Sequence, residues 1–311
     1  MPDVTVLYVS WNTADELDAS LQALTQTNAT VDLEIIVVDN ASTDRTVEML
    51  RNGDPAVCLI ANSENRGFAT AVNQGWQAAT ASLVLIMNPD TLLQPGTLAA
   101  MVAFMRASPG LAACAPALCD EDGNATETAR PFPPLTLRLD HDIRARPHGE
   151  PLDISDGPWG DATRAHWLMG ACLLVRREAL ADTDGFDEGF FLYAEDIDWC
   201  YRARKAGWEI ALLDDLAATH FGNRSASQVP SRTSTWRRHD GYFRYIARAH
   251  GPLAARANFL WWLLRSALAS AVLCPLALVR PSLRFRRDHE LGRLGFCLRH
   301  LGAPFVLCRF D

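Results

Sequence analysis

The chain begins with an apolar segment, Val4-Thr-Val-Leu-Tyr-Val-Ser10, that is typical of a buried strand. It is the first of several apolar segments that alternate with helical ones, and this alternation indicates the fold class. A helical pattern follows from Asp15 to about Thr25, with Leu17, Leu21 and Leu24 on one side, and a second apolar run covers Leu33 to Val38. Three more segments continue the alternation: strands over 56–61 and 83–87, and a helix over 68–80 between them. Strands that are apolar on both faces and alternate with helices predict a mostly parallel sheet with helices on both faces.

Polar side chains follow three of these strands at the point where each strand ends. They form the clusters Ser10–Asn12, Asp39–Ser42 and Asn88–Asp90. Ligands of such sheets bind beyond the carboxyl ends of the strands. The sequence therefore predicts a ligand site where the three clusters meet.

The second half of the chain is less regular. Residues 119–165 contain six prolines among scattered charges, which predicts a long surface loop. Regular structure is expected to resume in four segments: a strand over 166–175, helices over 177–181 and 195–206, and a last strand over 208–213. From Trp236 onward the pattern is helical and aromatic.

Composition excludes several classes of protein. The chain has 311 residues, 49% hydrophobic and 21% charged, which is typical of a globular protein and not of a disordered or fibrous one. Lys205 is the only lysine and no Gly-Lys-Ser/Thr loop exists, so a P-loop nucleotidase is excluded. The eight cysteines never form Cys-x-x-Cys, and no signal peptide is recognised, so we expect a cytoplasmic, reducing location.

Charge is distributed unevenly along the chain. Residues 1–223 carry 14 basic and 33 acidic side chains, a net charge of −19, whereas residues 224–311 carry 15 basic and 4 acidic ones, a net charge of +11. The formal net charge of the whole chain is −8, which does not favour a nucleic-acid binder. The asymmetry indicates that the C-terminal region has a task of its own.

Two acidic motifs could carry chemistry. In Asn88-Pro89-Asp90, two oxygen-bearing side chains follow a strand and could converge on a hard cation or on a ribose-phosphate, although a helix-capping turn has the same pattern. In Glu195-Asp196-Ile197-Asp198, three carboxylates begin a helix behind an aromatic run. Apolar surroundings raise the pKa of a carboxyl group and suit a general base, whereas the helix dipole alone also favours acids there.

Two further motifs are weaker. Asn65-Arg66-Gly67 precedes a helix that contains Asn73, and this arrangement suits a diphosphate or ribose contact as well as an ordinary helix cap. His220 follows a strand, where a histidine is more often structural than a ligand.

Taken together, these motifs resemble the inverting glycosyltransferase family 2, in particular its bacterial rhamnosyltransferase-like branch. The resemblance rests on six motifs in order: Ser10-Trp11-Asn12, Val37-Val38-Asp39-Asn40-Ala41-Ser42, Asn65-Arg66-Gly67-Phe68, Asn88-Pro89-Asp90, Gly170-Ala171 and Glu195-Asp196. It implies a GT-A fold, Rossmann-like, over residues 1–225, with a nucleotide-binding half over about 1–118 and an acceptor half over 119–225. Residues 226–311 would form a helical, basic and apolar C-terminal region.

The resemblance also implies roles for individual residues. Asp196 would be the catalytic base, with Glu195 beside it, and Asp90 and His220 would hold Mg²⁺ or Mn²⁺. The sugar would be bordered by Trp167, Met169 and Gly170. The nucleotide or donor would be bound by Ser10, Asn12, Asp39, Asn40, Arg66, Gly67, Asn73 and Asn88. Asn88 departs from the family's Asp-x-Asp pattern, which removes one acidic metal ligand.

The implied reaction is transfer of a sugar, with rhamnose from dTDP-rhamnose as the best choice, to a saccharide or lipid-linked acceptor in polysaccharide synthesis. The alternatives are a non-catalytic nucleotide-sugar-binding scaffold and a nucleotidyltransferase on a related fold. Intact Asp90, Glu195 and Asp196 argue against the scaffold, and the missing Gly-rich phosphate loop argues against the nucleotidyltransferase.

The C-terminal region contains a long apolar segment. Phe259–Val279 has 21 residues, close to the length that spans a bilayer, but Arg265 lies inside it and Pro275 would kink it. Arginines follow it from Arg280 onward, which fits a helix in the interface of an anionic leaflet. We expect peripheral attachment to the inner face of the cell membrane, with packing on the protein and spanning as the alternatives.

Overall fold

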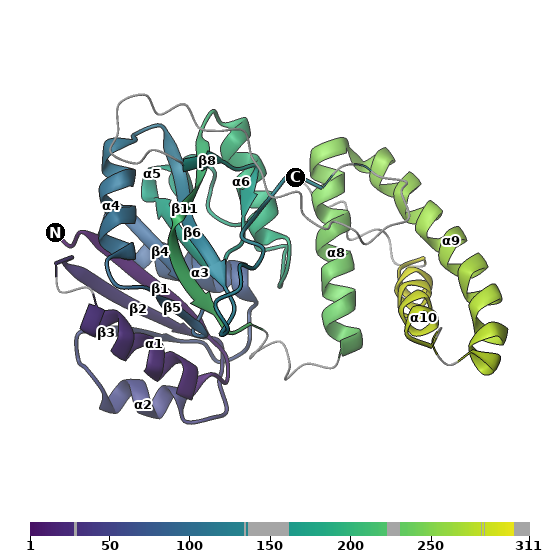
Figure 1. The fold of residues 1–311 in the computed structure, drawn as a ribbon, viewed down its shortest axis with the longest axis horizontal. Coiled ribbons are helices and arrows are strands. Elements are labelled where there is room, and N and C mark those ends of the chain that lie inside the picture. The colour runs from purple at the N-terminus through teal and green to yellow at the C-terminus, as the bar shows by residue number, and fades with distance from the viewer. Residues whose placement is uncertain are drawn as a thin grey trace. The chain divides into compact units, whose positions relative to one another are not determined.

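The computed structural model describes residues 1–27, 30–133, 135, 162–222, 231–280, 282 and 284–301 (Figure 1). These residues divide into two compact units. The first contains the described residues up to Phe132, residues 162–191 and residues 195–222; the second contains Pro133, residue 135, Leu192–Ala194 and the residues from 231 onward.

A nine-stranded sheet forms the centre of the first unit, with strand order β3-β2-β1-β4-β10-β6-β11-β5 and with β8 paired to β11. The strands are β1 (Val4–Ser10), β2 (Leu33–Asp39), β3 (Val57–Ala61), β4 (Leu83–Met87), β5 (Thr91–Leu93), β6 (Leu111–Cys119), β8 (Ala162–Arg164), β10 (Cys172–Arg176) and β11 (Glu209–His220). Six strands run in one direction, and β5, β8 and β10 run in the other. A separate two-stranded sheet pairs β7 (Ala129–Arg130) with β9 (Trp167–Leu168).

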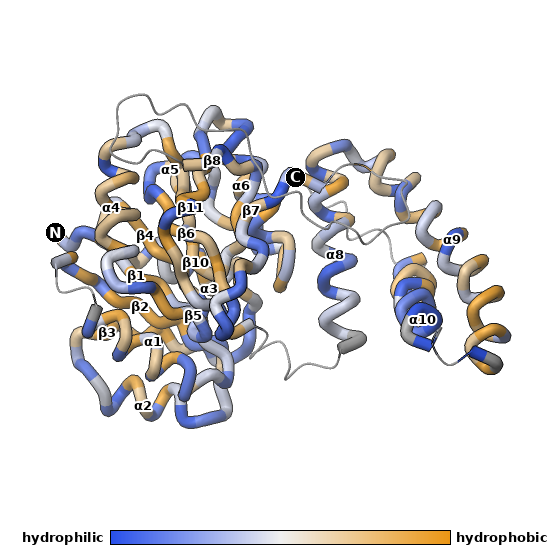
Figure 2. The backbone as a smooth tube through the Cα atoms, viewed as in Figure 1, coloured by the Kyte–Doolittle hydropathy of each residue, from blue (hydrophilic) through white to orange (hydrophobic). Residues whose placement is uncertain are grey.

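Helices cover both faces of this sheet, because side chains alternate between the two sides of each buried strand. In β1, Val6 and Tyr8 pack in one core and Leu7 packs in the other. The first core is closed by α1 (Ala14–Thr27), α2 (Thr46–Asn52) and α4 (Thr97–Ala107). The second is closed by α3 (Phe68–Ala78), α5 (Arg177–Asp182) and α6 (Glu195–Lys205). Figure 2 shows the hydrophobic strands between the two helical layers.

Most predicted elements are confirmed. The strands expected over 4–10, 33–38, 56–61 and 83–87 are β1 to β4, and the helices expected over 68–80, 177–181 and 195–206 are α3, α5 and α6. The last strand is longer than expected, and the strand expected over 166–175 is divided into β9 and β10. The loop expected over 119–165 contains β7 and β8, while its residues 136–161 and the expected domain boundary at 225 lie outside the described residues.

The second unit is helical, as expected. It consists of α8 (Ser231–His250), α9 (Pro252–Val279) and α10 (Arg284–His300) around a small core of Phe243, Phe259, Phe296 and Cys297. Gly251, with φ +88°, makes the turn between α8 and α9 in a conformation that favours glycine. Among the described residues, one helix, over Pro252–Leu278, is long and apolar enough to cross a membrane by length and composition.

Candidate active site

The loops after β1 and β2 hold each other in place. Asn12, at φ 52°, accepts a hydrogen bond on Oδ1 from the Thr43 backbone N–H at 2.6 Å, and its own N–H donates to Ser42 Oγ at 2.8 Å. The Ser10 hydroxyl bonds to Thr13 Oγ1 at 3.0 Å. These contacts make a rigid edge at the carboxyl ends of the two strands, where the sequence predicted the site.

Asp39 leaves one buried oxygen for a ligand. It is 1% exposed, and its Oδ2 accepts the backbone N–H of Ser42 at 2.9 Å. Its Oδ1 is buried and has no hydrogen-bond partner among the described residues. Buried acceptors are nearly always hydrogen-bonded in native proteins, so this oxygen suits an N–H or O–H group of a bound molecule.

Asn40 fixes the loop that carries Arg66. Its Nδ2 donates to the Gly67 carbonyl at 3.0 Å, and its Oδ1 accepts from Asn62 Nδ2 at 3.0 Å. Gly67 has φ +86°, and a Cβ there would lie 2.6 Å from the Phe191 carbonyl oxygen. Asn40 and Gly67 therefore position the loop, and the exposed side chain of Arg66 is the charge that the loop presents.

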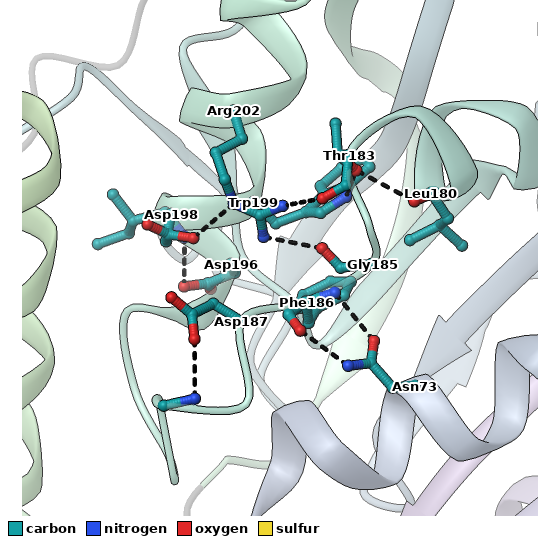
Figure 3. Close-up of polar contacts among 12 residues, drawn as sticks. Asn73, Leu180, Thr183, Gly185, Phe186, Asp187, Asp196, Asp198, Trp199 and Arg202 are labelled. Carbon is teal, nitrogen blue, oxygen red and sulfur yellow. Dashed lines mark hydrogen bonds and ion pairs between the residues drawn. The ribbon is translucent and has the colours of Figure 1, made fainter. Parts of the chain in front are cut away.

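The side chain of Asn73, which was expected to bind the donor, forms hydrogen bonds within the protein. Its Nδ2 donates to the Phe186 carbonyl at 2.8 Å, and its Oδ1 accepts from the Phe186 backbone N–H at 2.9 Å (Figure 3). Its Oδ1 also accepts from Trp76 Nε1 at 3.1 Å. In this structure Asn73 is a positioning residue for the segment that precedes α6.

Asp90 and His220, the two predicted metal ligands, lie next to each other. Antiparallel pairing of β5 with β11 places Thr91 opposite His220, so the residue before Thr91 reaches the same point. Asp90 Oδ1 lies 3.3 Å from His220 Nε2, and Asp90 is 8% exposed. Asn88 lies two residues before Asp90, and its side chain is half-buried.

Asp196 lies in the first turn of α6 with its carboxylate bound by two backbone amides. Oδ2 accepts from the Gly170 N–H at 3.1 Å, and Oδ1 accepts from the Ile197 N–H at 2.8 Å. The side chain keeps some contact with solvent, but the surrounding protein removes most of its hydration, and this desolvation raises the pKa of the Asp196 carboxyl above its ordinary value. The amide hydrogen bonds and the positive charge of Arg130 lower that pKa in part.

Asp198 is buried for a structural reason. It is completely inaccessible, and its Oδ2 pairs with Arg202 Nε at 2.8 Å. Arg202 also donates to the Gly185 carbonyl at 2.8 Å, as Figure 3 shows. Asn73 and Asp198 thus hold the same segment from α3 and α6, and Asp196 is the carboxylate of the motif whose pKa is raised while it keeps contact with solvent.

A short chain of contacts joins the acidic groups. The Asn88 N–H donates to the Ala171 carbonyl at 2.9 Å, and the adjacent Gly170 binds Asp196. The Asn88-Pro89-Asp90 motif and Asp196 therefore meet at the Gly170-Ala171 turn. Both acidic motifs thus contact the same turn.

The three residues expected to border the sugar differ in accessibility. A Cβ at Gly170 would lie 3.8 Å from Asp196 Oδ2, and Met169 is half-buried beside it. Trp167 is 7% exposed, and its indole N–H donates to the Pro131 carbonyl at 3.2 Å. Met169 and Gly170 are thus better placed at the surface near Asp196 than Trp167 is.

Sequence reasoning missed two features of the site. Arg130 acts electrostatically on Asp196 from β7, inside the segment expected to be a loop, and nothing in its sequence context indicates this. Tyr193 and Ala194, with φ 75° and 70°, are left-handed immediately before Glu195. Such backbone strain in non-glycine residues is concentrated at functional sites. Glu195 itself is 6% exposed.

Comparisons with known sequences identify a family for this chain. The model of glycosyl transferase family 2 matches residues 5–183, and that of glycosyl transferase family 21 matches residues 159–282. The N-acetylglucosaminyl-diphospho-decaprenol L-rhamnosyltransferase of Mycobacterium tuberculosis is 31% identical over 94% of this chain and 96% of its own length. The rhamnosyltransferase WbbL of Escherichia coli is 34% identical over 28% of this chain and 32% of its own.

Solved structures share the fold. A mannosyltransferase from Pyrobaculum calidifontis, in complex with GDP-Man and Mn²⁺, has a TM-score of 0.57 at 21% identity and covers 97% of this chain and 87% of its own. GalNAc-T7 with UDP, GalNAc and Mn²⁺ has a TM-score of 0.61 at 15% identity and covers 97% of this chain and 56% of its own. At these identities the match concerns the arrangement of the chain alone.

Proposed function

The chain belongs to glycosyl transferase family 2 and has the GT-A fold, and we propose that it transfers rhamnose. In this proposal the sugar moves from a nucleoside-diphosphate donor to a lipid-linked saccharide, with inversion at the anomeric carbon. It is a glycosyltransferase by family. The observation that carries the proposed chemistry is the position of the Asp196 carboxylate, which two backbone amides hold at the turn where the two acidic motifs meet; desolvation there raises its pKa.

Asp196 takes the proton of the acceptor hydroxyl in this proposal. A general base works best when its pKa approaches the working pH, and desolvation moves the pKa of Asp196 in that direction. The two backbone amides fix the carboxylate, so that it holds one direction while the hydroxyl oxygen attacks. A single displacement inverts the anomeric centre and needs no covalent sugar-enzyme intermediate.

The donor lies along the carboxyl ends of β1, β2 and β4. The unpartnered Oδ1 of Asp39 accepts an N–H of the nucleobase or a ribose hydroxyl. Arg66, presented by the Asn40–Gly67 contact, is available to the negative diphosphate. Ser10 and Asn12 shape the edge between these two contacts.

The residues at Asp90 fit a divalent cation that is weakly held by the protein. Asp90 supplies carboxylate oxygens, and His220 supplies an imidazole nitrogen that Mn²⁺ tolerates better than Mg²⁺ does. No group of three or more His, Cys, Asp or Glu side chains with metal-site geometry occurs in the described part of the chain, so Asp90 and His220 alone would leave most of the ion's shell to the donor diphosphate and water. When bound, such an ion neutralises the charge of the leaving diphosphate.

The identity of sugar and acceptor is supported by the relatives. The Mycobacterium tuberculosis relative that matches along nearly its whole length is named for L-rhamnose transfer to a decaprenol-linked acceptor, and the Escherichia coli relative is named as a rhamnosyltransferase. We therefore propose dTDP-rhamnose as donor and a role in cell-surface polysaccharide synthesis at the inner face of the cell membrane.

The test is a panel of nucleotide sugars offered to the purified full-length protein with Mn²⁺ and a short-chain analogue of an N-acetylglucosaminyl-diphospho-lipid. We expect transfer from dTDP-rhamnose, with an anomeric configuration in the product opposite to that of the donor, as read by NMR. Retained configuration would overturn the single displacement. Transfer from another donor alone would overturn the rhamnosyl assignment and leave the base intact.

A further inference from the structure

In the middle of α9 the exposed residues are apolar and the polar residues are buried or paired. Its outer face is defined here by Leu260, Leu264, Leu268, Val272 and Leu276, which recur every four residues, so that each lies beside the next in a stripe that winds slowly around the exposed side of the helix. Their exposures lie between 44% and 62%, and every exposed residue from position 257 to 278 is apolar. Figure 2 shows the predominance of hydrophobic residues in α9.

The polar side chains in the middle of α9 are instead turned into the unit. Ser266 is fully buried, and its hydroxyl donates to Glu290 Oε2 of α10 at 3.0 Å. Arg265 pairs with Glu290 Oε1 at 3.1 Å. The exposed side of α9 therefore lacks the polar residues that a helix on the surface of a water-soluble domain carries. Arg265, which argued against a membrane in the sequence, is neutralised by its partner in α10.

We propose that the outer face of α9 is a membrane-binding surface that lies in the headgroup interface of an anionic bilayer. The inference extends the membrane location proposed above, but it rests on the surface of α9 and not on the transfer reaction. A continuous exposed apolar face on a folded unit marks an interaction site.

The positive charge around the outer face of α9 favours an anionic membrane as its binding partner. Residues 241–287 contain eight arginines and no acidic residue. Arg256 lies near the start of α9, Arg280 follows its end, and both are exposed. Anionic headgroups complement an apolar face that is bounded by arginines. A second copy of this chain would bring the same positive charges against one another.

The neighbouring helix favours the interface over a spanning orientation. Because α10 packs along α9, a spanning α9 would take α10 into the hydrocarbon. That helix carries Arg284, Arg286, Arg287, Arg293 and Arg299 within 17 residues. Charged side chains at that depth are costly, whereas a helix parallel to the surface leaves them in the headgroup region.

The test is flotation of the full-length protein with vesicles of equal parts phosphatidylcholine and phosphatidylglycerol. We expect the wild type to float, and Leu264→Asp combined with Leu268→Asp to lower the vesicle-bound partition coefficient by at least about tenfold. Ala103→Asp with Ala107→Asp is the matched control, because it adds the same two charges four residues apart on an exposed face of α4. That control is expected to float like the wild type.

Charge is tested by a second set of variants, which also covers the case in which the aspartate pair prevents folding. Arg280→Gln, Arg284→Gln and Arg286→Gln together should weaken binding by roughly fivefold per arginine removed. The control for net charge removes three exposed arginines of the first unit together, with the substitutions Arg45→Gln, Arg51→Gln and Arg106→Gln.

Three results would overturn the proposal: a wild type that stays unbound, aspartate variants that float like the wild type, or a wild-type dimer that the aspartate pair dissociates in the absence of lipid. Because sugar transfer is not measured, each of these results leaves the proposed reaction standing.

Discussion

Replacing Asn73 with alanine separates a positioning role from donor binding. The Asn73 side-chain amide bonds to both polar groups of the Phe186 backbone: it donates to the carbonyl at 2.8 Å and accepts from the N–H at 2.9 Å. Phe186 is 1% exposed. Asn73→Ala leaves a buried N–H and a buried C=O without a partner. At about 1–2 kcal/mol for each group, we expect a loss of about 3 kcal/mol in the free energy of unfolding.

Urea unfolding followed by circular dichroism measures this loss, and calorimetric titration with dTDP measures donor binding. Gln77→Ala is the matched control, since Gln77 is exposed on the same helix and its removal should change stability by less than about 0.5 kcal/mol. The dissociation constant of dTDP should stay within about twofold of the wild type, because the Asn73 amide bonds to Phe186 and not to the proposed donor. An unchanged unfolding curve together with a tenfold weaker dTDP affinity would refute the positioning role and restore Asn73 as a donor contact.

Three other variants and conditions test the site. Gly67→Ala should lower the free energy of unfolding, measured by urea denaturation, by about 2–4 kcal/mol. The reason is that the positive φ of Gly67 and the 2.6 Å approach of a Cβ to the Phe191 carbonyl oxygen both oppose a side chain there. Unchanged stability would show that this loop can move. The transfer rate should fall as the pH drops through the raised pKa of Asp196, with a midpoint above the ordinary value of 3.8, and a midpoint at or below that value would contradict the desolvation argument. Since the folded state then binds this proton more tightly than the unfolded chain does, the contribution of this carboxyl to stability falls as the pH rises from 3.8 through the folded pKa. His220→Ala should raise the half-saturating Mn²⁺ concentration for transfer at least about tenfold, while His250→Ala, an exposed histidine of α8, should leave it unchanged.

The strands that lead into the candidate site could be predicted because their signal is local. Val4–Ser10 and Leu83–Met87 are buried on both faces, so uninterrupted apolar runs mark them. The strand β6 was missed because Leu111–Cys119 is rich in alanine and contains Pro116, which is not a typical strand composition. The strand β5 has three residues, too few to show a period. The antiparallel direction of β10 depends on its neighbours and has no local sequence signal.

Some features of the candidate site could likewise be predicted from local sequence, and others could not. The sequence placed polar residues at the ends of the right strands, and the pairing of β5 with β11 then explains why Asp90 and His220 meet. It did not indicate that the amides of Asn40 and Asn73 would be used on backbone groups, because those partners are 27 and 113 residues away along the chain. An asparagine at a helix start or strand end has the same local pattern whether it binds a ligand or a loop.

The variant Asp196→Asn, measured for transfer and for donor binding in the same preparation, tests most directly whether Asp196 is the base. Removing a general base should lower kcat by about 10²–10⁴-fold, while the dissociation constant of dTDP-rhamnose stays within about twofold, since the proposed nucleotide contacts are Asp39 and Arg66. Asp122→Asn, an exposed carboxylate elsewhere in the first unit, should transfer like the wild type. An Asp196→Asn enzyme that keeps its kcat would show that another group takes the proton.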